Sequence, residues 1–151
     1  MNRDPCRIGF VIVTHGALGE ELLRVARYIL GKGLENFRTV AVPFMGELQP
    51  PPAGVAPFAD RRERIRTLLA AAMAEVDQGN GVMLLTDLVG GTSSNVAQEM
   101  TGGNRGAVVA GVNLPMLLKA ASLDTASVAD AVADLVRRSR NAIQPLPGKK
   151  A

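Results

Sequence analysis

The sequence predicts an α/β domain in which a doubly wound, mainly parallel sheet carries helices on both faces. Short apolar runs alternate with helical patterns along the chain, which is typical of β-α-β units. The apolar runs are continuous, as expected for strands buried on both faces of a parallel sheet. With 151 residues, 47% of them hydrophobic, the chain has the material for one core. We expect a single domain over 1–151, with its core at about 8–143 and a basic C-terminal tail at 144–151.

The first part of the chain predicts one complete β-α-β unit. Residues 8–13 are apolar and rich in branched side chains, and they are expected to form the first strand. Residues 18–30 carry apolar side chains at helical spacing, with glutamates in the first turn, and predict an amphipathic helix. Residues 37–42 predict the second strand, reached by a right-handed crossover. The next stretch, 43–57, holds five of the nine prolines and is expected to be a surface loop.

A second helix is expected to begin with Asp60 as its N-cap residue. Glu63 follows at the third position, and apolar residues then recur at helical spacing as far as Val76, which is the pattern of a capped amphipathic helix. Its first turns carry three arginines, which are expected to lie on a solvated face, with a docking surface for a phosphorylated partner as the alternative. These arginines are Arg61, Arg62 and Arg64.

The rest of the chain predicts two more strands and three more helical segments. Residues 82–86 are expected to form a third apolar strand, and the glycine-rich turn after it leads into a short helix ending near Met100. A fourth strand is expected at 106–112. The segment 113–115 opens a helical turn, since proline is tolerated at the first helical position. A final helix at 128–140 has arginines near its C-terminus, where cations suit the helix dipole.

The common strand order for such a chain is 2-1-3-4, which makes the first and third strands neighbours. Their following helices then leave on opposite faces, and the crevice outside the carboxyl ends of these two strands is where such folds bind ligands. Two segments are expected to line this crevice, residues 14–16 and residues 86–93.

His15 is the single histidine of the chain, and it directly follows the first strand. A neutral imidazole can attack phosphorus through one ring nitrogen if the other nitrogen holds the proton, so this chemistry needs a neighbour that fixes the tautomer. Asp87 follows the third strand as His15 follows the first, and the two side chains are therefore expected to meet. A carboxylate there would also stabilise positive charge on the ring.

The Gly90-Gly91-Thr92-Ser93 turn has the features of a phosphate-binding site. Glycines let the backbone approach a ligand closely, and the following helix N-terminus presents N–H donors. A hydroxyl from Thr92 or Ser93 could add a further donor. Gly16 would likewise let the backbone approach a ligand closely beside His15, where the first helix starts. Phosphoryl transfer needs positioning and charge neutralisation above all, and this set of residues offers both.

Each of these features also has a purely structural interpretation. A lone His15 at a strand end is often structural, Asp87 alone could cap the next helix, and two adjacent glycines alone mark only a turn. Their matched positions beside a predicted ligand crevice favour a functional site. In the proline-rich loop, Phe44 and Met45 are expected to anchor the loop against the body of the domain, with a lid as the alternative.

Composition excludes several other classes of protein. No apolar run approaches the length of a transmembrane helix, and residues 1–5 lack the pattern of a secretory signal, so we expect a cytoplasmic protein. Cys6 is the single cysteine, which excludes an intrachain disulfide, and with one histidine the chain cannot form a zinc site of the usual kind. Only 3% of residues are aromatic, which leaves few stacking platforms for single-stranded nucleic acid.

Three stretches together resemble the IIA components of the mannose-type family of the bacterial phosphoenolpyruvate:sugar phosphotransferase system. They are IGFVIVTHG at 8–16, LLTDLVGGTSSN at 84–95 and AGVNLPML at 110–117. The similarity covers about residues 8–143, and the three motifs occur in order at spacing suited to one domain.

The resemblance implies that His15 accepts a phosphoryl group from the phosphorylated carrier protein HPr and passes it to a IIB component. It implies phosphorylation of the Nε2 nitrogen, a bond from Asp87 to the other ring nitrogen, and a hydroxyl of Thr92 near the phosphate. It also implies a cytoplasmic homodimer that needs no metal or organic cofactor. The IIB component would act with membrane components IIC and IID, so the chain would serve carbohydrate uptake indirectly.

Two departures from the family pattern and two rival functions remain. The family commonly has proline where Ser93 stands, and the triple proline at 50–52 is unusual.

One rival function is a phosphatase with His15 as nucleophile, although such enzymes usually add arginines and a second histidine, and this chain has no second histidine. The other is a regulatory phosphoprotein of an incomplete phosphotransferase system, which would also retain His15. A IIA component does not contact the sugar, so the sequence does not identify it.

Overall fold

The computed structural model describes residues 7–44, 57–103, 105–123, 125 and 127–148. Strands and helices alternate over most of this chain, as the sequence predicts. The strands are β1 (Gly9–His15), β2 (Phe37–Val42), β3 (Val82–Thr86) and β4 (Gly106–Ala110). The helices are α1 (Leu18–Leu30), α2 (Pro57–Val76), α3 (Thr92–Met100), α4 (Leu114–Ala120) and α5 (Val128–Asn141).

The four strands form one parallel sheet in the order β2-β1-β3-β4. This confirms the predicted order and places β1 and β3 side by side at the centre. Val13 of β1 pairs with Thr86, the last residue of β3. The residues that follow these two strands therefore emerge beside one another at the carboxyl edge of the sheet, which is where the predicted crevice lies.

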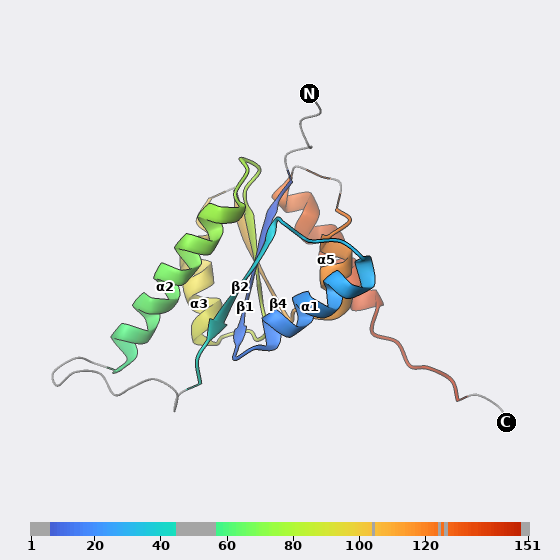
Figure 1. Ribbon diagram of the computed structural model, residues 1–151, viewed down its shortest axis with the longest axis horizontal. Coiled ribbons are helices and arrows are strands. Elements are labelled where there is room, and N and C mark those ends of the chain that lie inside the picture. Colours follow the sequence, from blue (N-terminus) through green and yellow to red (C-terminus); the bar gives the residue numbers. More distant parts are fainter. Residues whose placement is uncertain (1–6, 45–56, 104, 124, 126, 149–151) are drawn as a thin grey trace.

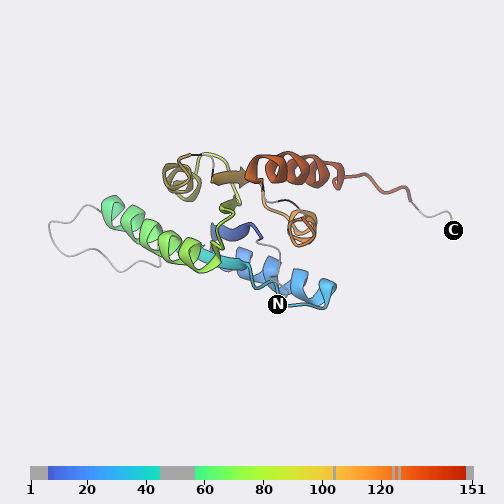
Figure 2. The ribbon, with the colours of Figure 1, turned by 90° about the horizontal axis from the view of Figure 1, so that it is seen from above.

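Helices cover both faces of the sheet, as predicted for a doubly wound fold. Figures 1 and 2 show α2 and α3 on one face and α1, α4 and α5 on the other. Alternate residues of β1 enter the two cores, with Phe10 and Ile12 on the α1 face and Val11 and Val13 on the α2 face. All four are buried, which explains why the strand is apolar without a break.

Three predicted boundaries are wrong. Strand β1 extends to His15 and does not end at residue 13, so His15 is part of the strand. Helix α2 begins at Pro57, so Asp60 lies inside the helix and is not its N-cap. Proline is suited to the first helical turn because it has no N–H group, and an N–H group there would have no acceptor within the helix. Strand β4 ends at Ala110, before the predicted end at residue 112. The amides of Gly111 and Val112 both donate to Thr86 O at 2.9 Å. Because two consecutive amides share one acceptor, the regular pairing of the strand ends there.

Most of the predicted proline-rich loop lies outside the described residues, and so does Met45. Pro43 and Phe44 directly follow β2, and Pro57 already belongs to α2. Among the described helices, none combines the length and the apolar character needed to cross a membrane.

Candidate functional site

His15 is the last residue of β1, and the chain turns sharply after it. Gly16 has a φ of +52°, a left-handed conformation that favours glycine, and its amide donates to Val42 O of β2 at 2.9 Å. Thr14 fixes the start of the next helix, because its Oγ1 accepts a hydrogen bond from the amide of Gly19 at 2.7 Å. The turn is thereby held on both sides, and the His15 side chain stays 29% exposed.

Asp87 lies directly beside His15, as the sequence predicts. Its Oδ2 is 2.8 Å from Nδ1 of the imidazole and accepts a second hydrogen bond, also at 2.8 Å, from the main-chain amide of His15. Its Oδ1 accepts from the amide of Leu88 at 2.9 Å. These three donors hold the carboxylate in one orientation. The two from His15 connect residues that are 72 positions apart in the chain.

The ionisation of Asp87 determines which imidazole nitrogen carries the proton. Burial raises the pKa of the Asp87 carboxyl, but the hydrogen bonds from the amide and ring of His15, the positive charge of the ring when protonated, and the amide of Leu88 outweigh burial and lower the pKa below 3.8. A carboxylate can only accept hydrogen bonds, so Nδ1 is the donor. In the neutral ring, Nε2 then carries the free lone pair.

The imidazole lies close to the N-terminus of α3. A Cβ atom built on Gly91, the N-cap residue of α3, would lie 3.9 Å from Cε1 of His15, the ring carbon that lies between Nδ1 and Nε2. The first amides of a helix have no acceptor within the helix and carry its positive dipole end. The free nitrogen of His15 is therefore near donors suited to an anion.

The remaining residues of the predicted glycine-rich turn have different environments. Gly90 has a φ of +78°, a left-handed backbone conformation that favours glycine at the turn into α3. Thr92 is half-buried at the first helical position. Ser93 is fully buried, and its Oγ has no hydrogen-bond partner among the described residues. Ser94 donates to Gly91 O at 2.9 Å.

Exposed apolar side chains lie at or near the His15 turn, and no sequence motif had indicated them. Phe44 packs on Gly16, since a Cβ on Gly16 would lie 2.8 Å from the Phe44 ring, yet the side chain remains about half exposed. The anchoring predicted for Phe44 therefore holds only in part. Two further exposed large side chains are near His15 and Asp87 in the sequence: Leu18 at the start of α1 and Leu88 directly after Asp87. Val89 is also exposed, but it lines a cavity between β4 and α5.

One of the three arginines at the start of α2, Arg61, differs from the prediction of a solvated face. Arg61 is buried, at 9% exposure, and donates to Pro43 O at 3.1 Å, so the solvated-face interpretation is wrong for this residue. Arg62 instead pairs with Glu99 of α3, while Arg64 is exposed. Arg61 shares the helical stripe of Ile65 and Leu69, and this spacing could have predicted its burial.

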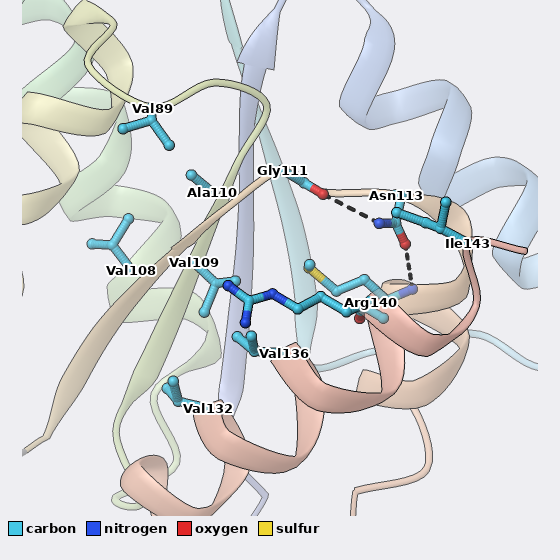
Figure 3. A pocket seen from close by; sticks show the side chains of 12 residues that line it. Val89, Val108, Val109, Ala110, Gly111, Asn113, Val132, Val136, Arg140 and Ile143 are labelled. Carbon is cyan, nitrogen blue, oxygen red and sulfur yellow. Dashed lines mark hydrogen bonds between the residues drawn. The ribbon is translucent and has the colours of Figure 1, made fainter.

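A separate apolar cavity of about 360 Å³ lies between β4 and α5. Figure 3 shows Val108 and Val109 on its strand side and Val132 and Val136 on its helix side, with Arg140 extending across it. Neither His15 nor Asp87 lines this cavity. Among the described residues, no group of three His, Cys, Asp or Glu side chains is arranged to hold a metal ion.

The fold and the site define a class: an open parallel α/β domain with a carboxylate-bound histidine beside a helix N-terminus at the switch point of the sheet. The profile of the EIIA-man family, described as "PTS system fructose IIA component", matches residues 52–137. The chain belongs to this family of mannose-type IIA components of the sugar phosphotransferase system. The matched range includes Asp87 and the start of α3, while His15 precedes it.

Full-length comparisons agree with this family. The chain is 31% identical over 145 residues to the mannose-specific EIIAB component of Escherichia coli K12, an alignment that covers 94% of this chain and 40% of that protein. The chain thus spans less than half the length of the curated relative. A solved mannose/sorbose-specific IIA subunit from Enterococcus faecalis is 26% identical, with a TM-score of 0.75 over 96% of this chain and 98% of that one. A solved EIIA component from Streptococcus agalactiae is 25% identical, with a TM-score of 0.68 over 91% and 96% of the two chains.

Proposed function

We propose that this chain is a phosphohistidine carrier in which His15 accepts a phosphoryl group from phosphorylated HPr and donates it to a IIB component. The contact between Nδ1 of His15 and the Asp87 carboxylate at 2.8 Å carries this proposal. It leaves Nε2 as the nucleophilic atom of an imidazole that is about one-third exposed. Membership of a phosphotransferase family supports the same chemistry.

In the proposed reaction the lone pair of Nε2 attacks the phosphorus atom of the donor. A new N–P bond forms while the bond between phosphorus and the donor atom breaks, and its electron pair leaves with the donor. The proton on Nδ1 stays in place, so the phosphorylated ring is cationic. The Asp87 carboxylate stabilises that charge at hydrogen-bond distance. The reverse step, with a IIB component as acceptor, uses the same groups.

The phosphoryl oxygens would be held by donors at the start of α3. Gly91 and Thr92 open the helix beside Cε1 of His15, and their amides and the helix dipole favour a negative group. Gly16 adjoins His15 and Gly90 adjoins Gly91, and both have a left-handed backbone without a side chain, which supports a role for them in leaving room for the phosphoryl group. No metal or organic cofactor enters this proposal.

The partners and assembly are also part of the proposal. The exposed side chains of Leu18, Phe44 and Leu88 support docking of HPr and of a IIB component, because exposed apolar surface marks protein-binding sites. We further infer a cytoplasmic homodimer. In the described part of the chain, β4 is an edge strand with an apolar cavity beside it, and Ile143 and Leu146 are exposed at 79% and 89%. Light scattering of the purified chain tests the dimer, and a monomer at micromolar concentration would refute it.

Phosphorylation by the purified general system tests the main proposal. Phosphoenolpyruvate, the first enzyme and HPr should label the wild type with one acid-labile phosphate, and His15→Ala should take up none. Because the chain has a single histidine, such a label assigns the residue directly. Circular dichroism should show that the variant is folded. Absence of label on the wild type, or full labelling of His15→Ala, would refute the proposal, and turnover of a generic phosphate ester would favour the phosphatase instead.

A further inference from the structure

Ser93 is the second residue of α3, and its side chain is fully buried. Its Oγ has no hydrogen-bond partner among the described residues. A buried hydroxyl that has lost its contacts with water and gained none in return destabilises the folded state, and such groups are uncommon in native proteins. The position therefore needs an explanation.

The other buried hydroxyls in the described part of the chain all have partners. Thr14 accepts from the amide of Gly19, Thr86 donates to Leu88 O, and Ser94 donates to Gly91 O. Ser139, on α5, donates to Leu135 O at 2.7 Å. The fold thus satisfies buried hydroxyls in general, and Ser93 departs from this rule at the N-terminus of the helix next to His15.

The position of the Ser93 hydroxyl indicates what its partner could be. A Cβ built on Gly91 would lie 3.8 Å from Oγ of Ser93 and 3.9 Å from Cε1 of His15. Oγ of Ser93 and Cε1 of His15, the ring carbon between Nδ1 and Nε2, are therefore separated by no more than these two lengths together. A phosphoryl group bonded to Nε2 would bring its oxygens to this part of the site, and such oxygens are strong hydrogen-bond acceptors.

We propose that Ser93 is a ligand of the phosphoryl group on His15 and that its hydroxyl gains its hydrogen bond only in the phosphorylated protein. This inference rests on the proposed function. The effect has two parts, because the hydroxyl destabilises the unmodified protein and stabilises the phosphorylated one. Both parts favour retention of the phosphoryl group. Proline, which the family resemblance gives at this position, has neither the hydroxyl nor the amide hydrogen, so Ser93→Pro removes both donors.

The test compares Ser93→Ala with Ser139→Ala, which removes a buried hydroxyl that already has a partner. For Ser93→Ala, the equilibrium constant for phosphoryl exchange with HPr should shift toward HPr about tenfold, the fold-change that corresponds to about 1.4 kcal/mol. The melting temperature of the unmodified variant should equal or exceed that of the wild type. Ser139→Ala should lower the melting temperature and leave the exchange equilibrium unchanged. Ser93→Pro should shift the equilibrium at least as far as Ser93→Ala.

The failure of this inference differs from the failure of the proposed function. A wild type that takes up no phosphate refutes the proposed function, and the role of Ser93 with it. A wild type that is phosphorylated, alongside a Ser93→Ala variant with the same exchange equilibrium, refutes only the role of Ser93. An unmodified Ser93→Ala protein that melts well below the wild type would also refute it, since the hydroxyl would then be stabilising without the phosphoryl group.

Discussion

A single oxygen of Asp87, Oδ2, lies 2.8 Å from both the ring Nδ1 and the main-chain amide of His15. The backbone bond holds the carboxylate at the end of β1, and the ring bond fixes the imidazole relative to the same backbone. The orientation of the ring therefore depends on one atom of Asp87, the residue directly after the neighbouring strand β3. This arrangement presets both the tautomer and the direction of Nε2 before any phosphoryl donor binds.

Asp87→Asn should slow phosphoryl transfer while leaving His15 in place. The amide removes the negative charge that stabilises the cationic phosphorylated ring. Its NH₂ group replaces one of the two carboxylate oxygens and cannot accept a hydrogen bond, so the donors of His15 and Leu88 cannot all keep their acceptors. We expect the rate constant for transfer from phosphorylated HPr to fall at least about tenfold, and by as much as about 10⁴-fold if the wrong tautomer dominates. Quench-flow kinetics measure this rate. A variant with the wild-type rate would remove Asp87 from the mechanism.

Gly16→Ala should damage both the fold and the site. The residue has a φ of +52°, and a Cβ would lie 2.8 Å from the Phe44 ring. Gly31→Ala is a matched control, because Gly31 has a φ of +61° and a Cβ there would meet no atom within 4 Å. Gly31→Ala should cost about 1 kcal/mol of unfolding free energy, and Gly16→Ala about 1–3 kcal/mol more. Urea denaturation measures both values, and equal losses would contradict the role assigned to Phe44.

Arg61→Met should destabilise the protein even though arginine is a common surface residue. Arg61 is buried and donates to O of Pro43, the residue after β2, so the substitution leaves a partly buried carbonyl without that donor. We expect the unfolding free energy to fall by about 1–3 kcal/mol. Arg64→Met, at an exposed position of the same helix, should change it by no more than about 0.5 kcal/mol. Similar effects of the two substitutions in urea unfolding would contradict a structural role for Arg61.

The parallel sheet and the pairing of His15 with Asp87 could be predicted because both follow from the chain pattern. Continuous apolar runs indicate strands buried on both faces, and neighbouring parallel strands deliver the residues after them to one edge of the sheet. The positions of His15 and Asp87 after two such runs therefore imply their contact, which the structure confirms. Their functional roles remain a proposal.

Other features depend on contacts that no local pattern contains. Asp60 and Glu63 form a capping pattern, but Pro57 can also open a helix, and α2 starts there. The end of β4 is set by Thr86 O, which accepts from Gly111 and Val112. The unpartnered hydroxyl of Ser93 results from the packing of α3 against the sheet. Sequence shows that a hydroxyl is present at Ser93, but only the structure shows that it lacks a partner.

Asp134 predicts a pH dependence of stability that is independent of the phosphorylation site. This residue of α5 accepts from Arg138 Nε at 2.9 Å and pairs with Lys119 of α4 at 3.2 Å. The hydrogen bond from Arg138, together with that from Lys119 and the charges of both, lowers the pKa of Asp134 from 3.8 to about 2. A lowered pKa means that the carboxylate stabilises the folded state above about pH 3.8 and that this contribution is lost as the pH falls through about 2.

Asp134→Asn should therefore lower the melting temperature at pH 7, because the amide keeps the shape of the side chain but removes its charge. The difference from the wild type should shrink between about pH 4 and pH 2, where the wild-type carboxylate becomes protonated. Asp130→Asn, at an exposed position on the first turn of α5, controls for the change in net charge. Melting curves at several pH values provide the measurement. A difference between wild type and Asp134→Asn that stays constant from pH 7 to pH 2 would show that the ion pairs of Asp134 do not link α4 to α5 in this way.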